Sequence, residues 1–108
     1  MSDTETAADG HTIIIRVAGD EEWNLDRLLA ELMSRGSDRF VLDLAGHDFL
    51  NSVKIAAIIQ GRHQVVEGEG QFRVANLEPR MRQIFSILKL ERLFNLDESL
   101  EDALAALD

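Results

Sequence analysis

The chain has 108 residues, of which 45% are hydrophobic, and it has no cysteine. This length and composition are typical of one globular domain with a single core, and the absence of cysteine excludes disulfides, thiol catalysis and thiolate metal sites and suits a reducing cytoplasm. The formal net charge of -9 argues against nucleic acid and anionic membranes as partners, because both are negatively charged, and it favours basic protein surfaces.

The first ten residues, MSDTETAADG, are acidic and polar. They lack the basic start and the apolar stretch of a secretory signal, and no apolar run in the chain approaches the roughly 20 residues that span a bilayer. We therefore predict a flexible acidic N-terminal arm at residues 1–10, with a weak edge strand as the alternative, and a folded domain at residues 11–108. We expect a cytoplasmic protein that is not inserted in a membrane.

Residues 11–46 have the patterns of a strand, a helix and a second strand. HTIIIRVAGD, residues 11–20, contains three consecutive isoleucines and ends in a turn, which predicts a buried strand. A helix follows, with Asn24 as a plausible N-cap and Gly36 as a plausible stop. RFVLDLAG, residues 39–46, predicts the next strand. The helix has one apolar face, formed by Leu25, Leu28, Leu29, Leu32 and Met33.

The second half of the chain continues this alternation. We predict a second helix that ends near Glu67, a third strand over Gln71–Ala75, a third helix in EPRMRQIFSILKL and a short strand at RLFNL, residues 92–96. Ser99 and Asp102 have the spacing of a capping box for a closing helix. Strands that alternate with helices predict an α/β fold with an at least partly parallel sheet. The second helix is indicated by the repeat of Ile55, Ile58, Ile59 and Val66, and the stripe expected to be buried in the third helix is Met81, Ile84, Phe85 and Leu88.

The stretch FLNSVKIAAIIQG, residues 49–61, places Ser52 where the second helix starts. One interpretation is a plain helix cap, because Asn and Ser are common at this position. The other is a site that a partner protein reads or modifies, because a helix start offers unpaired N–H groups and the positive end of a dipole, which favour a phosphate. A phosphate would add nearly two negative charges, so one hydroxyl could act as a switch. Both interpretations stay open at this point.

Two residues near this helix start also have two interpretations each. Lys54 is a cation in the first turn and opposes the helix dipole, at a cost of roughly 0.3–1 kcal/mol. It is either a solvated side chain or a contact for a partner or a phosphate. Trp23 lies in a polar loop, and it either packs over the edge of the core or contacts a partner, since tryptophan is enriched at interface hot spots.

No pattern in the sequence indicates a catalytic or metal site. His11, His47 and His63 are scattered without ligand spacing. The acidic run at residues 20–22 is more typical of a solvated turn than of a catalytic cluster, and GEG at residues 68–70 is too short for a phosphate cradle. We therefore predict no enzyme activity, no cofactor and no bound metal.

Three segments resemble the STAS domain, the family of anti-sigma-factor antagonists. FVLDLAGHDFLNS resembles the strand and turn that lead to the family's Asp-Ser-Ser-Gly motif. FRVANLEPRMRQIFSILKLERLF resembles the later strand, turn and helix, and DESLEDALAAL resembles the closing helix. The resemblance spans residues 12–107, and it implies a single STAS-like domain with a mixed, mostly parallel sheet of four or five strands flanked by about four helices.

The resemblance also implies a regulatory role in bacterial transcription through protein binding. In the antagonists, the unmodified domain binds an anti-sigma kinase of the histidine-kinase-like ATPase type, which then uses ATP to phosphorylate the first serine of the motif, and the complex dissociates. Ser52 matches that serine. Asn51, Val53 and Lys54 stand where the motif has Asp, Ser and Gly. Residues 20–22 loosely match the family's acidic loop, so the predicted partner-binding set is Asp20, Glu22, Trp23, Asn51, Ser52, Val53 and Lys54.

Two functions are consistent with these observations. The first is an antagonist-like module that binds a partner kinase or anti-sigma factor and is switched by phosphorylation at Ser52. The alternative is a STAS adaptor without the switch, in a signalling assembly or as an accessory subunit of a lipid-transport ABC system. The retained serine favours the first function, whereas the changed motif positions favour the second. Association with a second copy of the chain is left open.

Overall fold

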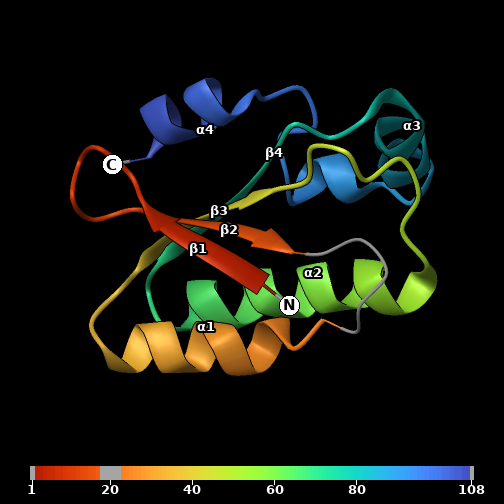
Figure 1. Cartoon of the computed structure of the whole chain (residues 1–108). Coiled ribbons are helices and arrows are strands. Elements are labelled where there is room, and N and C mark those ends of the chain that lie inside the picture. The colour runs from red at the N-terminus through yellow and green to blue at the C-terminus, as the bar shows by residue number, and fades with distance from the viewer. Residues whose placement is uncertain (1, 18–22, 108) are drawn as a thin grey trace.

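The computed structural model describes residues 2–17 and 23–107. Within them the chain forms four strands, four α-helices and one 3₁₀ helix, shown in Figure 1. In chain order these elements are β1 (Ser2–Thr6), β2 (Ile13–Val17), α1 (Leu25–Ser34), β3 (Arg39–Asp43), α2 (Ser52–Glu67), β4 (Gln71–Ala75), α3 (Pro79–Ile87), η1 (Leu90–Arg92) and α4 (Leu100–Ala106). The predicted α/β fold with a mixed, mostly parallel sheet is confirmed.

The sheet has the strand order β1-β2-β3-β4. β2, β3 and β4 are parallel, and β1 runs antiparallel to β2. Figure 1 shows α1 and α2 side by side against one face of the sheet and α4 against the other. Because the three parallel strands point the same way, the loops that follow them gather at one edge of the sheet, which is the edge where open α/β sheets usually bind their ligands.

The main core lies between the sheet and the layer that contains α1 and α2. Phe40, Leu42 and Ile58 are completely buried there. Gly61 allows α1 and α2 to pack closely, because a Cβ at this position would lie 3.0 Å from the Leu29 side chain. A smaller cluster on the opposite face joins Val41 of β3 to Ala103 of α4. The sheet therefore has apolar cover on both faces, as the hydrophobic strand sequences predict.

The N-terminal segment corrects one prediction. Residues 2–6 form the edge strand β1, paired with β2 from Ser2↔Val17 to Thr6↔Ile13, so the flexible arm predicted for residues 1–10 is wrong here and the edge-strand alternative is confirmed. The turn between the strands is closed by Asp9, whose carboxylate accepts the N–H of Thr12 at 2.9 Å and of His11 at 2.8 Å and the Thr12 hydroxyl at 2.7 Å. These bonds lower the pKa of Asp9 to about 2, with the Thr12 N–H as the largest cause.

Two predictions in the second half are also wrong, namely the strand at residues 92–96 and the burial of Leu88. Residues 92–96 do not form a strand: Lys89 takes a left-handed conformation with φ 61° after α3, and η1 follows. This turn buries Leu90 and Phe94 on the core instead of extending the chain. Val66 and Leu88 are exposed by 45% and 52%, because Val65, one position earlier, takes the inward place on α2, and α3 ends at Ile87.

Within the part of the chain that the structure describes, no helix has both the length and the apolar surface needed to cross a bilayer.

Candidate functional site

The candidate site is the loop between β3 and α2, residues 44–51, together with the first turn of α2. Figure 1 shows the start of α2 at the same end of the sheet as α3. The loop leaves the carboxyl end of β3, the middle parallel strand. Its backbone is anchored at once, because the Leu44 N–H donates to the carbonyl of Ala75 at the end of β4, at 2.9 Å.

Asp43, the last residue of β3, fixes the start of this loop. One carboxylate oxygen accepts the Ala45 N–H and the Asn76 side-chain N–H, each at 3.0 Å, and the other accepts Arg16 Nε at 3.3 Å. Asp43 is 7% exposed. A buried carboxylate needs such partners because its desolvation is costly. Asp43 therefore joins the carboxyl ends of β2, β3 and β4 around the root of the loop.

Further contacts hold the middle of the loop. Gly46, at a positive φ of 85°, donates its N–H to the carboxylate of Glu78 at 3.0 Å. His47 Nε2 lies 3.0 Å from the carbonyl oxygen of Val17. A carbonyl only accepts, so this ring nitrogen carries the hydrogen. Contacts to β2 and to the segment before α3 thus fix the path by which the loop reaches α2.

Asn51 and Ser52 have different roles at the start of α2. Asn51 is the N-cap: its side-chain oxygen accepts the Lys54 N–H at 2.9 Å, and its carbonyl accepts the Ile55 N–H at 3.0 Å. Ser52 is the first helical residue and is exposed. Its hydroxyl makes no hydrogen bond to any other residue within 2–17 and 23–107. The interpretation of Ser52 as the helix cap is therefore wrong, since Asn51 is the N-cap.

Apolar side chains flank the serine. Val53 is 72% exposed and Phe49 is 58% exposed. The guanidinium carbon of Arg80, in the first turn of α3, lies 5.6 Å from the centre of the Phe49 ring, a cation–π contact. The surface around Ser52 is therefore a mixture of apolar and cationic groups in a chain whose net charge is -9.

Trp23 and Lys54 meet beside the same helix start. Lys54 Nζ lies 5.3 Å from the centre of the Trp23 ring, and the ring meets His47 edge-on at 5.6 Å. Trp23 is half-buried and packs against the main core. The packing interpretation of Trp23 is confirmed, and a partner contact stays a prediction. Lys54 is half-buried as well, and so it is not a purely solvated side chain.

The structure brings together five of the seven predicted partner-binding residues. Asp20 and Glu22, the other two, lie outside the described residues. No group of three His, Asp or Glu side chains within residues 2–17 and 23–107 has a metal-binding arrangement.

Sequence reasoning overlooked four residues of the site: Asp43, Phe49, Asn76 and Glu78. Asp43 carried a usable signal, because it is a carboxylate directly after a run of buried strand residues. Asn76 and Glu78 had no local sequence signal. Asn76 lies 33 positions from its partner Asp43, and Glu78 lies 32 positions from its partner Gly46.

The family is decided by comparison with known proteins. The model of the STAS domain family matches residues 4–103. The chain belongs to the STAS domain family. The match begins in β1 and ends in α4, so it includes part of β1 and all of β2, β3 and β4.

A curated relative is found in Bordetella bronchiseptica, where it carries the name of an anti-sigma factor antagonist, BtrV. It is 30% identical to this chain over 86 residues, which cover 77% of this chain and 74% of the relative.

Solved structures with the same fold include an anti-sigma factor antagonist from Mycobacterium paratuberculosis, at a TM-score of 0.77 and 22% identity, with 99% of this chain and 94% of that chain covered. The Bacillus cell fate determinant SpoIIAA in its phosphorylated form matches at a TM-score of 0.68 and 17% identity, with 97% of both chains covered. At these identities the likeness concerns the fold.

Proposed function

We propose that this protein is an anti-sigma-factor antagonist-like regulator that binds a protein partner with the surface around Ser52 and is switched by phosphorylation of Ser52. The partner is a kinase or anti-sigma factor of the histidine-kinase-like ATPase type. Membership of the STAS family and the name of the Bordetella relative support the regulatory role. The Bacillus protein SpoIIAA, which has the same fold, exists in a phosphorylated form.

The proposed switch depends mainly on one observation: Asn51, and not Ser52, caps α2. Asn51 supplies the cap bond to the Lys54 N–H, so the Ser52 hydroxyl is not needed to cap α2. An exposed hydroxyl that contributes nothing to the helix can receive a group without loss of a structural hydrogen bond. Ser52 therefore has the accessibility that a modification site needs.

The chemistry of the switch is a phosphoryl transfer. The Ser52 oxygen attacks the γ-phosphorus of ATP held by the kinase, an O–P bond forms, the bond to the β-phosphate oxygen breaks, ADP leaves, and the hydroxyl proton goes to a base of the kinase. The product carries about 1.5–2 negative charges at the positive end of the α2 dipole. α2 has no acidic residue in its first turn, so no carboxylate there opposes the phosphate.

Phosphorylation would release the partner through local electrostatics and bulk. Phe49 and Val53 supply exposed apolar area on either side of Ser52. Their burial under a partner would desolvate Ser52 as well, and a doubly charged phosphate in such an interface is costly because its hydration is lost. Binding should therefore weaken while the fold remains unchanged.

The test uses Ser52→Ala and Ser52→Asp with each histidine-kinase-like ATPase encoded in the same genome. Ser52→Asp should weaken binding at least about tenfold, which corresponds to about 1.4 kcal/mol, with little change in thermal stability. Ala105→Asp, on an exposed position of α4, adds the same charge elsewhere and should leave affinity unchanged. Equal affinities for the wild type and both Ser52 variants would reject the switch and favour the constitutive STAS adaptor.

A further inference from the structure

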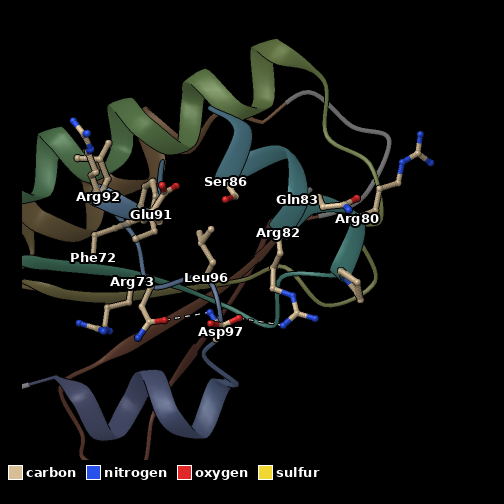
Figure 2. Close-up of a pocket in the computed structure, with 14 residues that line it drawn as sticks. Phe72, Arg73, Arg80, Arg82, Gln83, Ser86, Glu91, Arg92, Leu96 and Asp97 are labelled. Atoms are coloured by element: carbon tan, nitrogen blue, oxygen red, sulfur yellow. Dashed lines mark hydrogen bonds and ion pairs between the residues drawn. The ribbon is translucent and has the colours of Figure 1, made fainter. Parts of the chain in front are cut away.

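A groove runs along α3 on the side away from its core contacts, and Figure 2 shows it in close-up. Its volume is about 1160 Å³. One wall comes from α3, the other from η1 and the residues after it, and β4 contributes Phe72 and Arg73. Most side chains drawn in Figure 2 come from α3 and from residues 91–97. None of the five predicted partner-binding residues that the structure describes, Trp23 and residues 51–54, lines this groove.

The charge of the groove is opposite to that of the molecule. The chain has 11 lysines and arginines against 20 carboxylates. The groove lining has four basic side chains and two acidic ones, Glu91 and Asp97, which leaves a net charge of +2. The four basic side chains are all arginines: Arg73, Arg80, Arg82 and Arg92.

The arginines differ in how firmly the fold holds them. Arg73 Nε donates to Glu98 at 2.8 Å, and the Glu98 side chain is 8% exposed, so this pair is part of the structure. Arg82 pairs with Asp97 at 3.2 Å, but the Asp97 side chain is 83% exposed. Such an exposed pair contributes little and exchanges readily with another carboxylate.

The remaining two arginines have no ion pair within the described part of the chain. Arg92 is exposed and forms no hydrogen bond or ion pair there. Arg80 makes only the cation–π contact with Phe49 within the same residues. Figure 2 shows Arg92 and Arg80 at opposite ends of the groove with their guanidinium groups directed outward, and Arg82 between them beside Asp97. The rim of the groove therefore has three guanidinium groups that are free or weakly held, and a guanidinium fork matches a carboxylate in a bidentate way.

Apolar side chains accompany the arginines. Phe72 and Phe94 are buried beneath the groove, and Leu93 and Leu96 are half-buried along it. A ligand that fits this lining needs carboxylates for the arginines and apolar side chains for the leucines. Free phosphate supplies only the first.

We propose that the groove binds an acidic peptide segment of a protein partner that carries apolar side chains between its carboxylates. Its volume exceeds the roughly 300–1000 Å³ of ordinary small-molecule pockets, and clusters of arginine are a known solution for acidic motifs. The chain itself has an example of the contact, because Asp97 lies across the groove from Arg82.

The position of the groove identifies the partner. Arg80 lines the groove and also lies over Phe49 in the loop that leads to Ser52, so the two surfaces are continuous. The acidic segment therefore belongs to the protein that contacts Ser52, an assignment that rests on the proposed function. Peptide binding in the groove does not depend on Ser52.

The probe is a fluorescent peptide of ten residues that alternates Glu with Leu, and the control probe has Lys in place of Glu. In ¹⁵N NMR titrations, the acidic peptide should shift the signals of residues 91–97 and the side-chain Nε–H of Arg82 and Arg92. Arg82→Gln with Arg92→Gln should weaken binding at least about tenfold. The matched control, Arg27→Gln on α1 with Arg35→Gln at its C-cap, changes two exposed positions, removes two cations elsewhere and should change affinity less than about twofold.

Several results would overturn the groove as a peptide site: no binding of the acidic peptide at millimolar concentration, equal binding of the Lys peptide, equal losses in both double variants, or displacement of the peptide by an equal concentration of inorganic phosphate.

The link to the partner is tested separately. The acidic peptide should bind Ser52→Asp as well as it binds the wild type, and Arg82→Gln with Arg92→Gln should weaken binding of the kinase partner. Unchanged partner affinity in that double variant would overturn the partner assignment and leave the Ser52 switch standing. A switch that fails while the peptide still binds would reject only the proposed function.

Discussion

The starts of α2 and α4 both carry a serine, yet the fold uses the two serines differently. Ser99 is the N-cap of α4: its hydroxyl accepts the Asp102 N–H at 3.1 Å, and the Asp102 carboxylate accepts the Ser99 N–H at 3.3 Å. Ser52 lies one position inside α2, after the capping Asn51, and its hydroxyl has no partner within residues 2–17 and 23–107. Thus one serine stabilises a helix through its hydroxyl, and the hydroxyl of the other takes no part in capping.

The largest expected effect concerns the support of the loop rather than either serine. Asp43→Ala removes the acceptor of the Ala45 N–H, the Asn76 side chain and Arg16 Nε. We expect a loss of more than about 2 kcal/mol in the free energy of unfolding, because three donors lose the charged acceptor that they share in a partly buried site. Urea denaturation measures this loss. Arg16 keeps its contact with Glu5, so a loss under about 1 kcal/mol would mean that Asp43 does not hold the loop.

Next in size is the loss of a helix cap. Ser99→Ala and Asn51→Ala should each lower the free energy of unfolding by about 0.5–2 kcal/mol, because each removes a side-chain acceptor for a helix N–H. Ser52→Ala should lower it by less than about 0.5 kcal/mol, as an ordinary surface change does. Urea denaturation of the three variants side by side makes the comparison, and a Ser52→Ala loss equal to that of Ser99→Ala would remove the distinction between the two serines.

A smaller effect is expected at Lys54. Lys54→Met removes a cation–π contact worth about 0.5–1 kcal/mol and also relieves about 0.3–1 kcal/mol of conflict with the helix dipole, so these two contributions to stability should nearly cancel. Trp23 is the only tryptophan in the chain, and its fluorescence should change because Lys54 Nζ leaves the ring face. An unaltered emission spectrum would show that the contact does not persist in solution.

The smallest effect is the pH response of the turn between β1 and β2. Asp9 resembles Ser99 because its side chain accepts backbone hydrogen bonds. These bonds lower the pKa of Asp9 from 3.8 to about 2. Since the folded pKa is the lower one, the carboxylate's contribution to stability is complete above pH 3.8 and is lost as the pH falls through about 2.

Carboxyl ¹³C NMR should give an Asp9 midpoint near 2 in the wild type. Asp9→Asn should be less stable than the wild type at about pH 6, and this difference should shrink as the pH falls toward about 2. An Asp9 midpoint near 3.8 would mean that its hydrogen bonds to Thr12 and His11 are not maintained in solution.

Local patterns predicted most of the fold, because strand hydrophobicity and helix periodicity depend on neighbouring residues. The bounds of α2 and β4, the Pro79 start of α3 and the Ser99 capping box agree with the structure. Residues 2–6 were harder, because their polar sequence becomes a strand only by pairing with the isoleucines of β2.

Contacts that are remote in sequence limited the prediction of the site. The pattern at residues 51 and 52 allowed either side chain to cap α2, and only the geometry assigns the cap to Asn51. The position of Ser52 also depends on a loop held by Asn76 and Glu78, which belong to another part of the sequence. For the same reason no local pattern indicated the arginine groove, whose walls come from α3 and from residues that were expected to form a strand.

The most direct test of the account is mass spectrometry of the intact protein and its peptides after incubation with the partner kinase and ATP. We expect one phosphoryl group, located on Ser52, and none on Ser52→Ala. A phosphoryl group on Ser99 or another residue, or the same extent of modification in Ser52→Ala, would contradict it.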